Sequence, residues 1–455
     1  MLSFNNLINK IKQVKAGKKS RAAAAGAAPL IVPRADHNIS RKLISPSALK
    51  VLNTLHEAGF EAYLVGGCVR DLLLGYEPKD FDIATDALPE QVHKLFRRSR
   101  LIGRRFKLVH VRFGRDEIIE VATFRAPPEA ENQVDGRIMQ DNVYGSLEQD
   151  AWRRDFTVNA LYYNIADFTI VDYTGGIADL QQGMIRLIGD KQVRYREDPV
   201  RMLRAIRFMA KLGLKLEPET EALIGELAPL LSDIPPARLF DETLKLYLSG
   251  QAAVTHELLC HYGVFDYLYP QTAALLHQES DNYPRVLLMK ALENTDKRLA
   301  NNKPVTPAFL FAALLWEPLR QRWIELSQSM PDIPAMQRAA GEVLAEQIQT
   351  VAIPKRFSLV TRDIWALQPR LARRQGKRAF ALLLQPKFRA GYDFLALRAE
   401  AGEPLQELTD WWTTFQQATA SEQTNMVNSL SKSEAEPKRR PRRRRRRKPA
   451  AKRAE

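Results

Sequence analysis

The sequence predicts an α+β domain at the N-terminal end, followed by all-α domains and a disordered basic tail. Three observations carry this prediction. Short strand patterns bounded by glycines run to about Gly189, long helical patterns replace them beyond Arg196, and from Ser421 the chain turns polar and loses its periodicity. Hydrophobic residues make up 45% of the chain and charged residues 27%, which is the balance of a globular protein.

Chain length and cysteine content indicate which class of protein this is. The chain has 455 residues, long enough for several domains with their own hydrophobic cores. Its two cysteines, Cys68 and Cys260, are too few for a disulfide framework or a four-thiolate zinc site. No run of about 18 apolar residues occurs, which argues against a membrane-spanning helix. We therefore expect a cytoplasmic protein, and we expect a monomer.

Much of the positive charge lies at the C-terminus. The formal net charge is +15, and residues 437–455 hold twelve Lys and Arg residues against one acid, Glu455. Such dense like charge repels itself, so the tail should be disordered. It would bind a polyanion such as RNA by releasing counterions, and a purely solubilising tail is the alternative.

The N-terminus is basic as well. Residues 1–35 hold seven Lys and Arg residues and no acid, and apolar residues from Leu2 to Val14 fall near helical spacing. One interpretation is a basic amphipathic helix in peripheral contact with a membrane. A frayed extension without function is the interpretation we favour. A signal peptide is not expected, because Ala22–Ala28 is only weakly apolar.

A strand, two glycines and a helix follow one another in the predicted α+β domain. Ala62–Val65 has the pattern of a short buried strand, Gly66 and Gly67 come next, and Cys68–Leu74 has a helical pattern with Arg70 on its polar side. Glycine has no side chain, so backbone N–H groups in such a turn can approach a phosphate closely. The turn therefore suits phosphate binding.

Two aspartates follow, and twelve residues separate the first of them from Gly67. Asp80 and Asp82 flank Phe81 in a predicted strand, so their side chains share one face while Phe81 anchors the strand in the core. Two carboxylates together with triphosphate oxygens suit Mg²⁺. A pair of such ions would activate an attacking hydroxyl and stabilise leaving pyrophosphate.

A third carboxylate is expected nearby, and two candidates stay open. Glu120 is an acid within an apolar strand pattern, which is costly to bury unless it binds something; a salt bridge to Arg125 is the structural alternative. Asp155 follows Arg154, and an aspartate beside arginines suits a triphosphate with its metal. Its structural alternative is to cap a helix running through Leu161.

The third group of candidates begins a predicted helix at Pro199. Glu197, Asp198 and Arg201 lie within about one turn and could present donors and acceptors to the edge of a nucleobase. Arg204 and Arg207 continue the same spacing of three residues. A solvated basic face on an amphipathic helix is the alternative for all three arginines.

Three motif blocks resemble one known family. LVGGCVRDLLLG with KDFDIATDALPEQV, then RRDFTVNALYYN, then REDPVRMLRAIRFMAKLG are similar to the blocks of class II nucleotidyltransferases of the polymerase β superfamily, which extend RNA 3′ ends without a template. The resemblance is specific from about residue 41 to 280 and fainter to about 410. It implies a polymerase-β-like head followed by a helical neck and body.

The resemblance also implies site roles. Asp80 and Asp82 would hold Mg²⁺, with Glu120 or Asp155 as the third carboxylate. Contacts to the substrate ATP would come from four residues for the triphosphate and four for the nucleobase: Gly66, Gly67, Arg70 and Arg154, then Glu197, Asp198, Arg201 and Arg204.

Poly(A) polymerases and CCA-adding enzymes share this core. The run Leu101–Val111 resembles a segment of bacterial poly(A) polymerases, and no His–Asp phosphohydrolase pattern follows. Basic C-terminal helices with the arginine tail suit binding of any RNA. We therefore predict a poly(A) polymerase acting on RNA 3′ ends, with RNA-decay proteins as possible partners. A CCA-adding enzyme is the alternative, and a non-catalytic RNA-binding scaffold ranks lower.

The predicted boundaries follow from these patterns. They give a basic N-terminal extension (1–40), a catalytic domain (41–189) and a base-reading and RNA-binding neck (190–280). A C-terminal RNA-binding domain (281–420) and an arginine-rich tail (421–455) follow.

Overall fold

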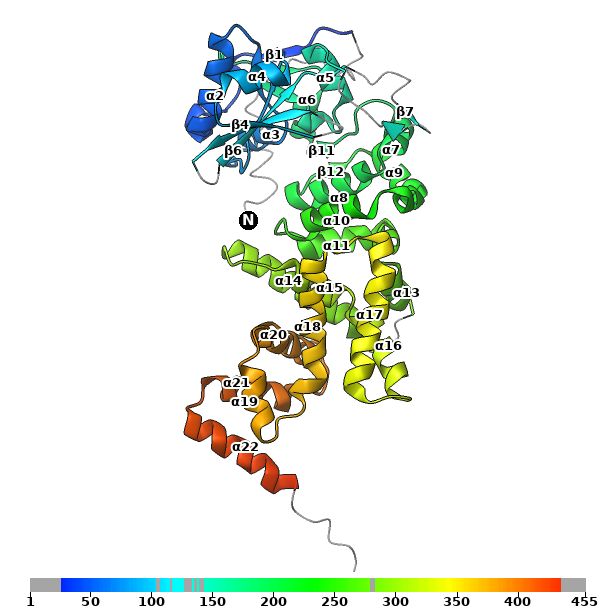
Figure 1. The fold of residues 1–455 in the computed structure, drawn as a ribbon. Helices are drawn as coiled ribbons and strands as arrows, with labels where there is room; N and C mark the ends of the chain where they lie inside the picture. Colours follow the sequence, from blue (N-terminus) through cyan, green and yellow to red (C-terminus); the bar gives the residue numbers. More distant parts are fainter. Residues whose placement is uncertain are drawn as a thin grey trace, which may run out of the picture. The chain divides into compact units, whose positions relative to one another are not determined.

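The N-terminal part of the chain is built on one eight-stranded sheet with the order β1-β10-β9-β2-β3-β6-β5-β4 (Figure 1). Neighbouring strands are antiparallel except for β3 and β6, which run parallel. The strands are β1 (Leu30–Val32), β2 (Ala62–Val65), β3 (Asp82–Thr85), β4 (Ser99–Ile102), β5 (Leu108–Phe113), β6 (Glu117–Thr123), β9 (Leu161–Asn164) and β10 (Ile170–Asp172). The α+β head that the sequence predicts is thus confirmed.

In this computed structural model the described residues are 26–103, 107–114, 117–126, 133–134, 137–138, 143–278 and 283–434. Three sets of predictions lie outside them. These concern the basic N-terminus before residue 26, part of the run Leu101–Val111, and the tail from residue 435.

Helices in the head pack on the sheet and supply its turns. They are α2 (Pro46–Glu57), α3 (Gly67–Leu73), α4 (Pro89–Leu95), α5 (Leu147–Arg153) and α6 (Gly176–Gln182), with 3₁₀ turns at Arg34–Asp36, Arg41–Leu43 and η4 (Thr157–Asn159). The α2 helix begins where the Ser45 hydroxyl accepts a hydrogen bond from the Ala48 N–H and proline occupies the first turn. Its apolar face is buried, as the 3.6-residue period predicts.

A helical neck follows the head. It comprises α7 (Lys191–Glu197), α8 (Val200–Leu212), α9 (Pro218–Leu227), η5 (Ala228–Asp233), α10 (Pro236–Tyr247), α11 (Ala252–His261), α12 (Phe265–Leu268) and α13 (Pro270–Leu276). A short parallel pair, β11 (Met184–Ile185) with β12 (Lys215–Leu216), joins the end of the head to the neck. A two-stranded hairpin, β7 (Gln133–Val134) with β8 (Arg137–Ile138), stands apart from the main sheet.

The rest of the described chain is helical, which also confirms the sequence-based expectation. The helices are α14 (Tyr283–Ala300), α15 (Pro307–Leu314), α16 (Trp316–Ser327), α17 (Asp332–Thr350), α18 (Lys355–Leu371), α19 (Lys377–Leu383), α20 (Phe388–Glu400), α21 (Gln406–Gln417) and α22 (Ala420–Glu434). Their C-terminal core is aromatic, with Trp412 and Phe415 fully buried against Phe388 and Tyr392.

The compact units differ from the predicted domain boundaries. Head and neck form one unit that runs to His277 and takes in Leu292–Val305 and Glu346–Ile353; a second unit holds Gln278–Ala291, Thr306–Ala345 and the chain from Pro354 onward. Predicted boundaries after residues 189 and 280 therefore do not fully separate the units, because two helical segments return to the first one.

Two predicted ends also shift. The predicted extension 1–40 contains β1, which pairs with β10 and buries Val32, so an apolar Leu-Ile-Val run makes these residues part of the sheet. The predicted disorder from residue 421 is wrong at its start. The α22 helix continues through Glu434 because Val427 is buried and Met426 packs on the aromatic core.

Among the described residues, no helix combines the length and the apolar character that a membrane span requires.

Candidate active site

The two predicted glycines form the turn between β2 and α3. Gly66 has a φ of +77°, a conformation that favours glycine. A Cβ atom at Gly66 would lie 3.5 Å from Arg154 Nη1, and one at Gly67 would lie 3.5 Å from Arg70 Nη2. The structure therefore brings together the four residues predicted to contact a triphosphate, Gly66, Gly67, Arg70 and Arg154.

Arg154 is held in place by two buried partners. Its Nε and Nη2 donate to Asp150 Oδ2 at 3.1 and 2.9 Å, and the Tyr162 hydroxyl lies 2.9 Å from Nε. Burial alone would lower the pKa of the Arg154 guanidinium, but these partners raise it, so the group stays charged. The orientation leaves Nη1 on the Gly66 side. Sequence analysis did not identify Asp150 or Tyr162.

Arg70 lies beneath the same turn and is almost fully buried. Its guanidinium pairs with Asp71 at 2.6 Å and donates to Asn159 Oδ1 at 2.5 Å. These contacts orient Arg70 from two sides of the head, because Asp71 belongs to α3 and Asn159 to η4. Asn159 was not predicted, although it stands in the second motif block four residues after Asp155.

The acidic residues meet at the β3–β6 pair. Asp82 is the direct partner of Glu120 in the parallel register, and Asp80 precedes β3 by two residues rather than lying within it. Partial burial raises the pKa of the Asp82 carboxyl, and the negative charges of Glu120 and Asp80 raise it further. The positive charge of Arg154 lowers it, and the resulting pKa is about 6. Three negative charges thus act on one another here.

The expected metal set is only partly assembled. In the described ranges, no three carboxylate, thiol or imidazole groups converge closely enough to hold a metal ion, and this includes Asp80, Asp82 and Glu120. Glu120 pairs instead with His110 Nε2 of the neighbouring strand β5 at 3.0 Å. The predicted alternative for Glu120 named Arg125, so this partner is a correction. His110 is positioned by the antiparallel register, which single-sequence reasoning does not reveal.

Asp155 is paired with α8. Its carboxylate accepts hydrogen bonds from Arg204 Nε at 2.7 Å, from the Phe156 N–H at 2.8 Å and from Asn159 Nδ2 at 3.2 Å. Burial would raise the pKa of the Asp155 carboxyl, but Arg204 and these hydrogen bonds lower it to about 2. The helix predicted through Leu161 does not form, since η4 is followed directly by strand β9.

The predicted base-reading residues lie at the junction of α7 and α8, and each is held by an ion pair. Glu197 ends α7 and accepts hydrogen bonds from Arg194 and Arg201, each at 2.9 Å. Asp198 accepts one from Arg238 of α10 at 2.7 Å. The single helical turn expected for Glu197, Asp198 and Arg201 is therefore divided between two helices, with Pro199 between them.

One further arginine ties this junction to the head. Arg194 Nη2 donates to the backbone carbonyls of Arg153 and Arg154 at 2.6 and 2.5 Å. The positions of Arg154 and of the α7–α8 junction are thus linked directly. Neither Arg194 nor Arg238 was among the predicted site residues.

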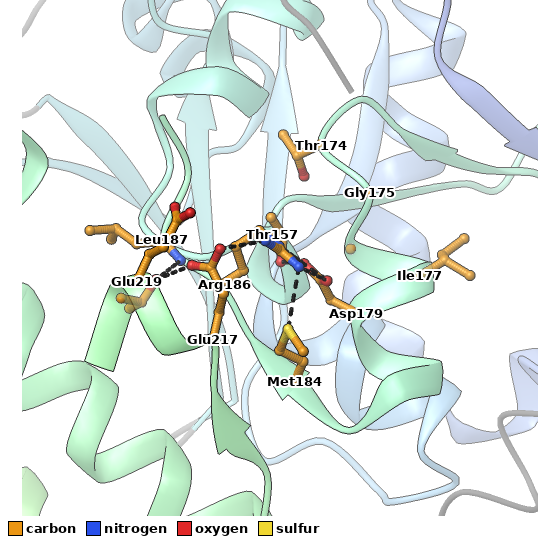
Figure 2. A network of polar contacts seen from close by, with 12 residues as sticks. Thr157, Thr174, Gly175, Ile177, Asp179, Met184, Arg186, Leu187, Glu217 and Glu219 are labelled. Atoms are coloured by element: carbon orange, nitrogen blue, oxygen red, sulfur yellow. Dashed lines mark hydrogen bonds and ion pairs between the residues drawn. The ribbon is translucent and has the colours of Figure 1, made fainter. Parts of the chain in front are cut away.

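A polar network lies where the head meets the neck. Figure 2 shows Arg186 between Asp179 of α6 and Glu217 before α9, with Nη1 2.6 Å from Glu217 and Nε 3.1 Å from Asp179. The Thr157 hydroxyl donates to Asp179 at 2.6 Å. A Cβ at Gly176 would lie 2.2 Å from the Thr157 carbonyl oxygen, so this close approach requires glycine. The network fixes η4, which includes Asn159 and follows Asp155, to the neck.

Family models match three stretches of the chain. The model described as Poly A polymerase head domain matches residues 62–186, and the one described as Probable RNA and SrmB- binding site of polymerase A matches residues 213–276. A third, Polymerase A arginine-rich C-terminus, matches residues 328–448. The first covers every predicted head residue from Gly66 to Asp155.

Individual proteins show the same similarity. A Poly(A) polymerase I of Escherichia coli O6:H1 is 50% identical over 451 residues, which cover 96% of this chain and 97% of that relative. A CCA-adding enzyme of Bacillus subtilis is 44% identical over 207 residues, which cover 45% of this chain and 51% of that relative. The crystal structure of Bacillus stearothermophilus CCA-adding enzyme in complex with CTP has a TM-score of 0.54 at 28% identity, with 85% and 84% of the two chains covered. Similarity along nearly the whole sequence is therefore to a poly(A) polymerase.

Proposed function

The chain belongs to the poly(A) polymerase family, and we propose that it adds AMP from ATP to RNA 3′ ends without a template, with release of pyrophosphate. The observation that carries this proposal is the pairing of Asp82 with Glu120 beside Arg154 and the Gly66 turn. It juxtaposes a negative region suited to a divalent cation and a positive region suited to a triphosphate.

A divalent cation fits this negative region. Burial raises the pKa of Asp82 most, and the negative charges of Glu120 and Asp80 raise it further; a bound cation would offset those charges. Asp80, Asp82 and Glu120 would have to draw closer together to hold the ion, and they supply the oxygen ligands that Mg²⁺ prefers. We propose Mg²⁺ as the ion; when bound, it would supply Lewis-acid stabilisation of charge at the phosphoryl oxygens.

The protein residues position the two substrates. Backbone N–H groups of the Gly66-Gly67 turn and the Arg154 guanidinium would hold the triphosphate, and Arg70 would support the turn from below. The Glu197–Arg201 pair and Asp198 would face adenine. The 3′-hydroxyl of RNA then attacks the α-phosphorus in line: a new P–O bond forms to the RNA, and the bond to pyrophosphate breaks.

Asp155 and Arg204 take a supporting role in this proposal. Their ion pair fixes α8, and with it the base-reading junction, against the segment that carries Arg154. Asp155 would therefore act through Arg154 and Arg204 and not as a ligand, which leaves Glu120 as the third carboxylate.

The second compact unit offers a surface for the rest of the RNA. A cavity of about 700 Å³ lies between α17, α18 and the segment before α20, and Arg362, Arg370 and Lys387 line it. Apolar Ala340 and Leu367 line it as well, and so does one acid, Asp363. Cations beside apolar side chains suit single-stranded RNA, whose phosphates pair with the cations. We propose that this unit and the basic tail bind RNA.

The physiological setting follows from the substrates. RNA and ATP meet in the bacterial cytoplasm, so we propose that the reaction takes place there and serves RNA processing and decay. These roles depend on the same chemistry and require no further site.

The direct test replaces the acidic pair. Asp80→Asn and Asp82→Asn should each reduce AMP addition to RNA at least about a thousandfold in Mg²⁺ while RNA binding stays within about twofold. Asp86→Asn, an exposed aspartate just after β3, is the matched control and should leave activity unchanged. An Asp82→Asn enzyme with wild-type turnover would overturn the assignment.

A further inference from the structure

A group of cations lies around Asp71, outside the contacts described so far. Lys211 at the end of α8 places Nζ 3.7 Å from Asp71 Oδ2, and Asp71 is also the partner of Arg70. Lys79 immediately precedes Asp80 in the chain. Arg207 lies one turn before Lys211 on the same helix. We call Lys79, Arg207 and Lys211 the Lys211 cluster.

One member of the cluster, Arg207, shares an aromatic ring with two arginines outside it. The Phe208 ring lies 5.1 Å from the Arg207 guanidinium carbon, 5.2 Å from that of Arg70 and 5.6 Å from that of Arg204. Phe208 is buried and packs edge-on against Phe156 at 5.7 Å. A shared ring of this kind attracts cations and fixes where their charges lie.

Positive charge exceeds negative charge here. Burial lowers the pKa of Lys211, Asp71 raises it, and Arg70, Arg207 and Lys79 each lower it by repulsion. Glu242 of α10 and Asp155 also act on Arg207. Glu242 Oε1 accepts a hydrogen bond from Lys245 at 2.8 Å, whereas its Oε2 is buried without a partner among the described residues. Arg207 Nε is buried and has no hydrogen-bond partner among the residues that the structure describes. The Lys211 cluster therefore has capacity for an added anion.

The location of the Lys211 cluster bears on how the two substrates are held for the reaction. In an in-line displacement at phosphorus, the attacking hydroxyl and the leaving pyrophosphate lie on opposite sides of the reacting atom. Both substrates are anionic, so each needs its own cations near the carboxylates. Arg154 acts on Asp82, whereas Lys79 adjoins Asp80 in the chain and Lys211 shares Asp71 with Arg70, so the Lys211 cluster adds cations on the Arg70 side.

We propose that Lys79, Arg207 and Lys211 bind the phosphodiester next to the 3′-terminal nucleotide of the RNA primer. The inference rests on the proposed function, because it names the residues that would place the attacking 3′-hydroxyl. One anionic phosphodiester brings two free oxygens, which match the guanidinium of half-buried Arg207 and a lysine ammonium. These are positioning residues for the primer, not for ATP.

The test measures primer and nucleotide separately. Steady-state addition of AMP to decaadenylate is followed for the wild type, Lys211→Gln, Lys79→Gln and Arg207→Gln at 50 to 200 mM salt. We expect KM for decaadenylate to rise about tenfold in each variant, with KM for ATP and kcat at saturating primer within about twofold. The slope of log(kcat/KM) for primer against log salt should flatten by about 0.7 per charge removed.

Two controls separate a local effect from a general one. Lys50→Gln removes the same charge from an exposed position on α2 and should leave every parameter unchanged. Arg207→Lys keeps a cation and should recover most of the primer affinity that Arg207→Gln loses.

The KM values and the salt slope separate the primer-binding role of the Lys211 cluster from the proposed function. Unchanged KM and salt slope for the primer in Lys211→Gln would overturn this inference and leave the proposed function standing. A rise in KM for ATP alone would assign the cluster to the triphosphate and also overturn it. A wild-type protein that adds no AMP to decaadenylate would instead refute the proposed function.

Discussion

The ion pair between Asp155 and Arg204 is expected to be a main stabilising contact between the head and the neck. The Asp155→Asn variant removes its negative charge and leaves Arg204 buried beside a neutral amide. The pKa of the Asp155 carboxyl is about 2 in the folded protein against an ordinary value of 3.8, with Arg204 its largest stabilising partner. That difference corresponds to about 2 kcal/mol of unfolding free energy at neutral pH. The uncompensated Arg204 could bring the loss to about 5 kcal/mol.

The pH dependence of this loss has a defined sign. Folding lowers the pKa of Asp155, so its contribution to stability is present above the pKa of the unfolded chain and is lost as the pH falls toward the folded value. We expect the full contribution above about pH 5, roughly half of it at about pH 3, and none below about pH 2. The stability difference between wild type and Asp155→Asn should shrink over that window.

The measurement is urea unfolding followed by tryptophan fluorescence at pH 7, 5, 4 and 3. A double-mutant cycle with Arg204→Gln isolates the pair, and its coupling energy should be about 2 kcal/mol at pH 7. Glu219→Gln, a largely exposed acid that pairs with Lys191 at 3.5 Å, is the control in the same unit and should change little. Equal stabilities at pH 7, or a difference that does not vary with pH, would refute this reasoning.

Three further predictions concern other parts of the chain. Gly66→Ala should raise KM for ATP and lower the free energy of unfolding by about 1–2 kcal/mol, because the φ of Gly66 is +77° and the added methyl would approach Arg154. The control Gly250→Ala, also at positive φ but with open space around it, should affect stability alone. Arg186→Leu should lower the free energy of unfolding by about 3 kcal/mol, since two buried acids lose their cation. In urea titrations, Arg186→Lys should recover part of this loss, and an Arg186→Leu variant as stable as the wild type would contradict the network's role. Removal of residues 437–455 should weaken RNA binding in filter assays and flatten its salt dependence while single-turnover chemistry stays the same; an unaltered salt slope would count against an RNA-binding tail.

Local patterns predicted the head well. The strand Ala62–Val65 is β2 residue for residue, and the glycine turn with its helix follows as expected. The apolar strand pattern that contains Glu120 is β6, which pairs with β5 in antiparallel register. Such elements are predictable because glycine conformation, alternation of apolar residues and short connections all act within about ten residues.

Pairings across long sequence separations were not predictable in the same way. Asp155 with Arg204, Glu120 with His110, and Asp198 with Arg238 each depend on which elements become neighbours in space. An isolated sequence shows only that each residue is charged. The same limit explains β1 and α22, whose order comes from a distant partner strand and from a distant aromatic core.

Template-independent addition of AMP is tested most directly by primer extension with each of the four nucleoside triphosphates separately, in Mg²⁺, on one short RNA. We expect a long ladder of products with ATP and little extension with CTP, GTP or UTP. Addition of a single A, or a requirement for CTP before any A is added, would contradict it and point to CCA addition instead.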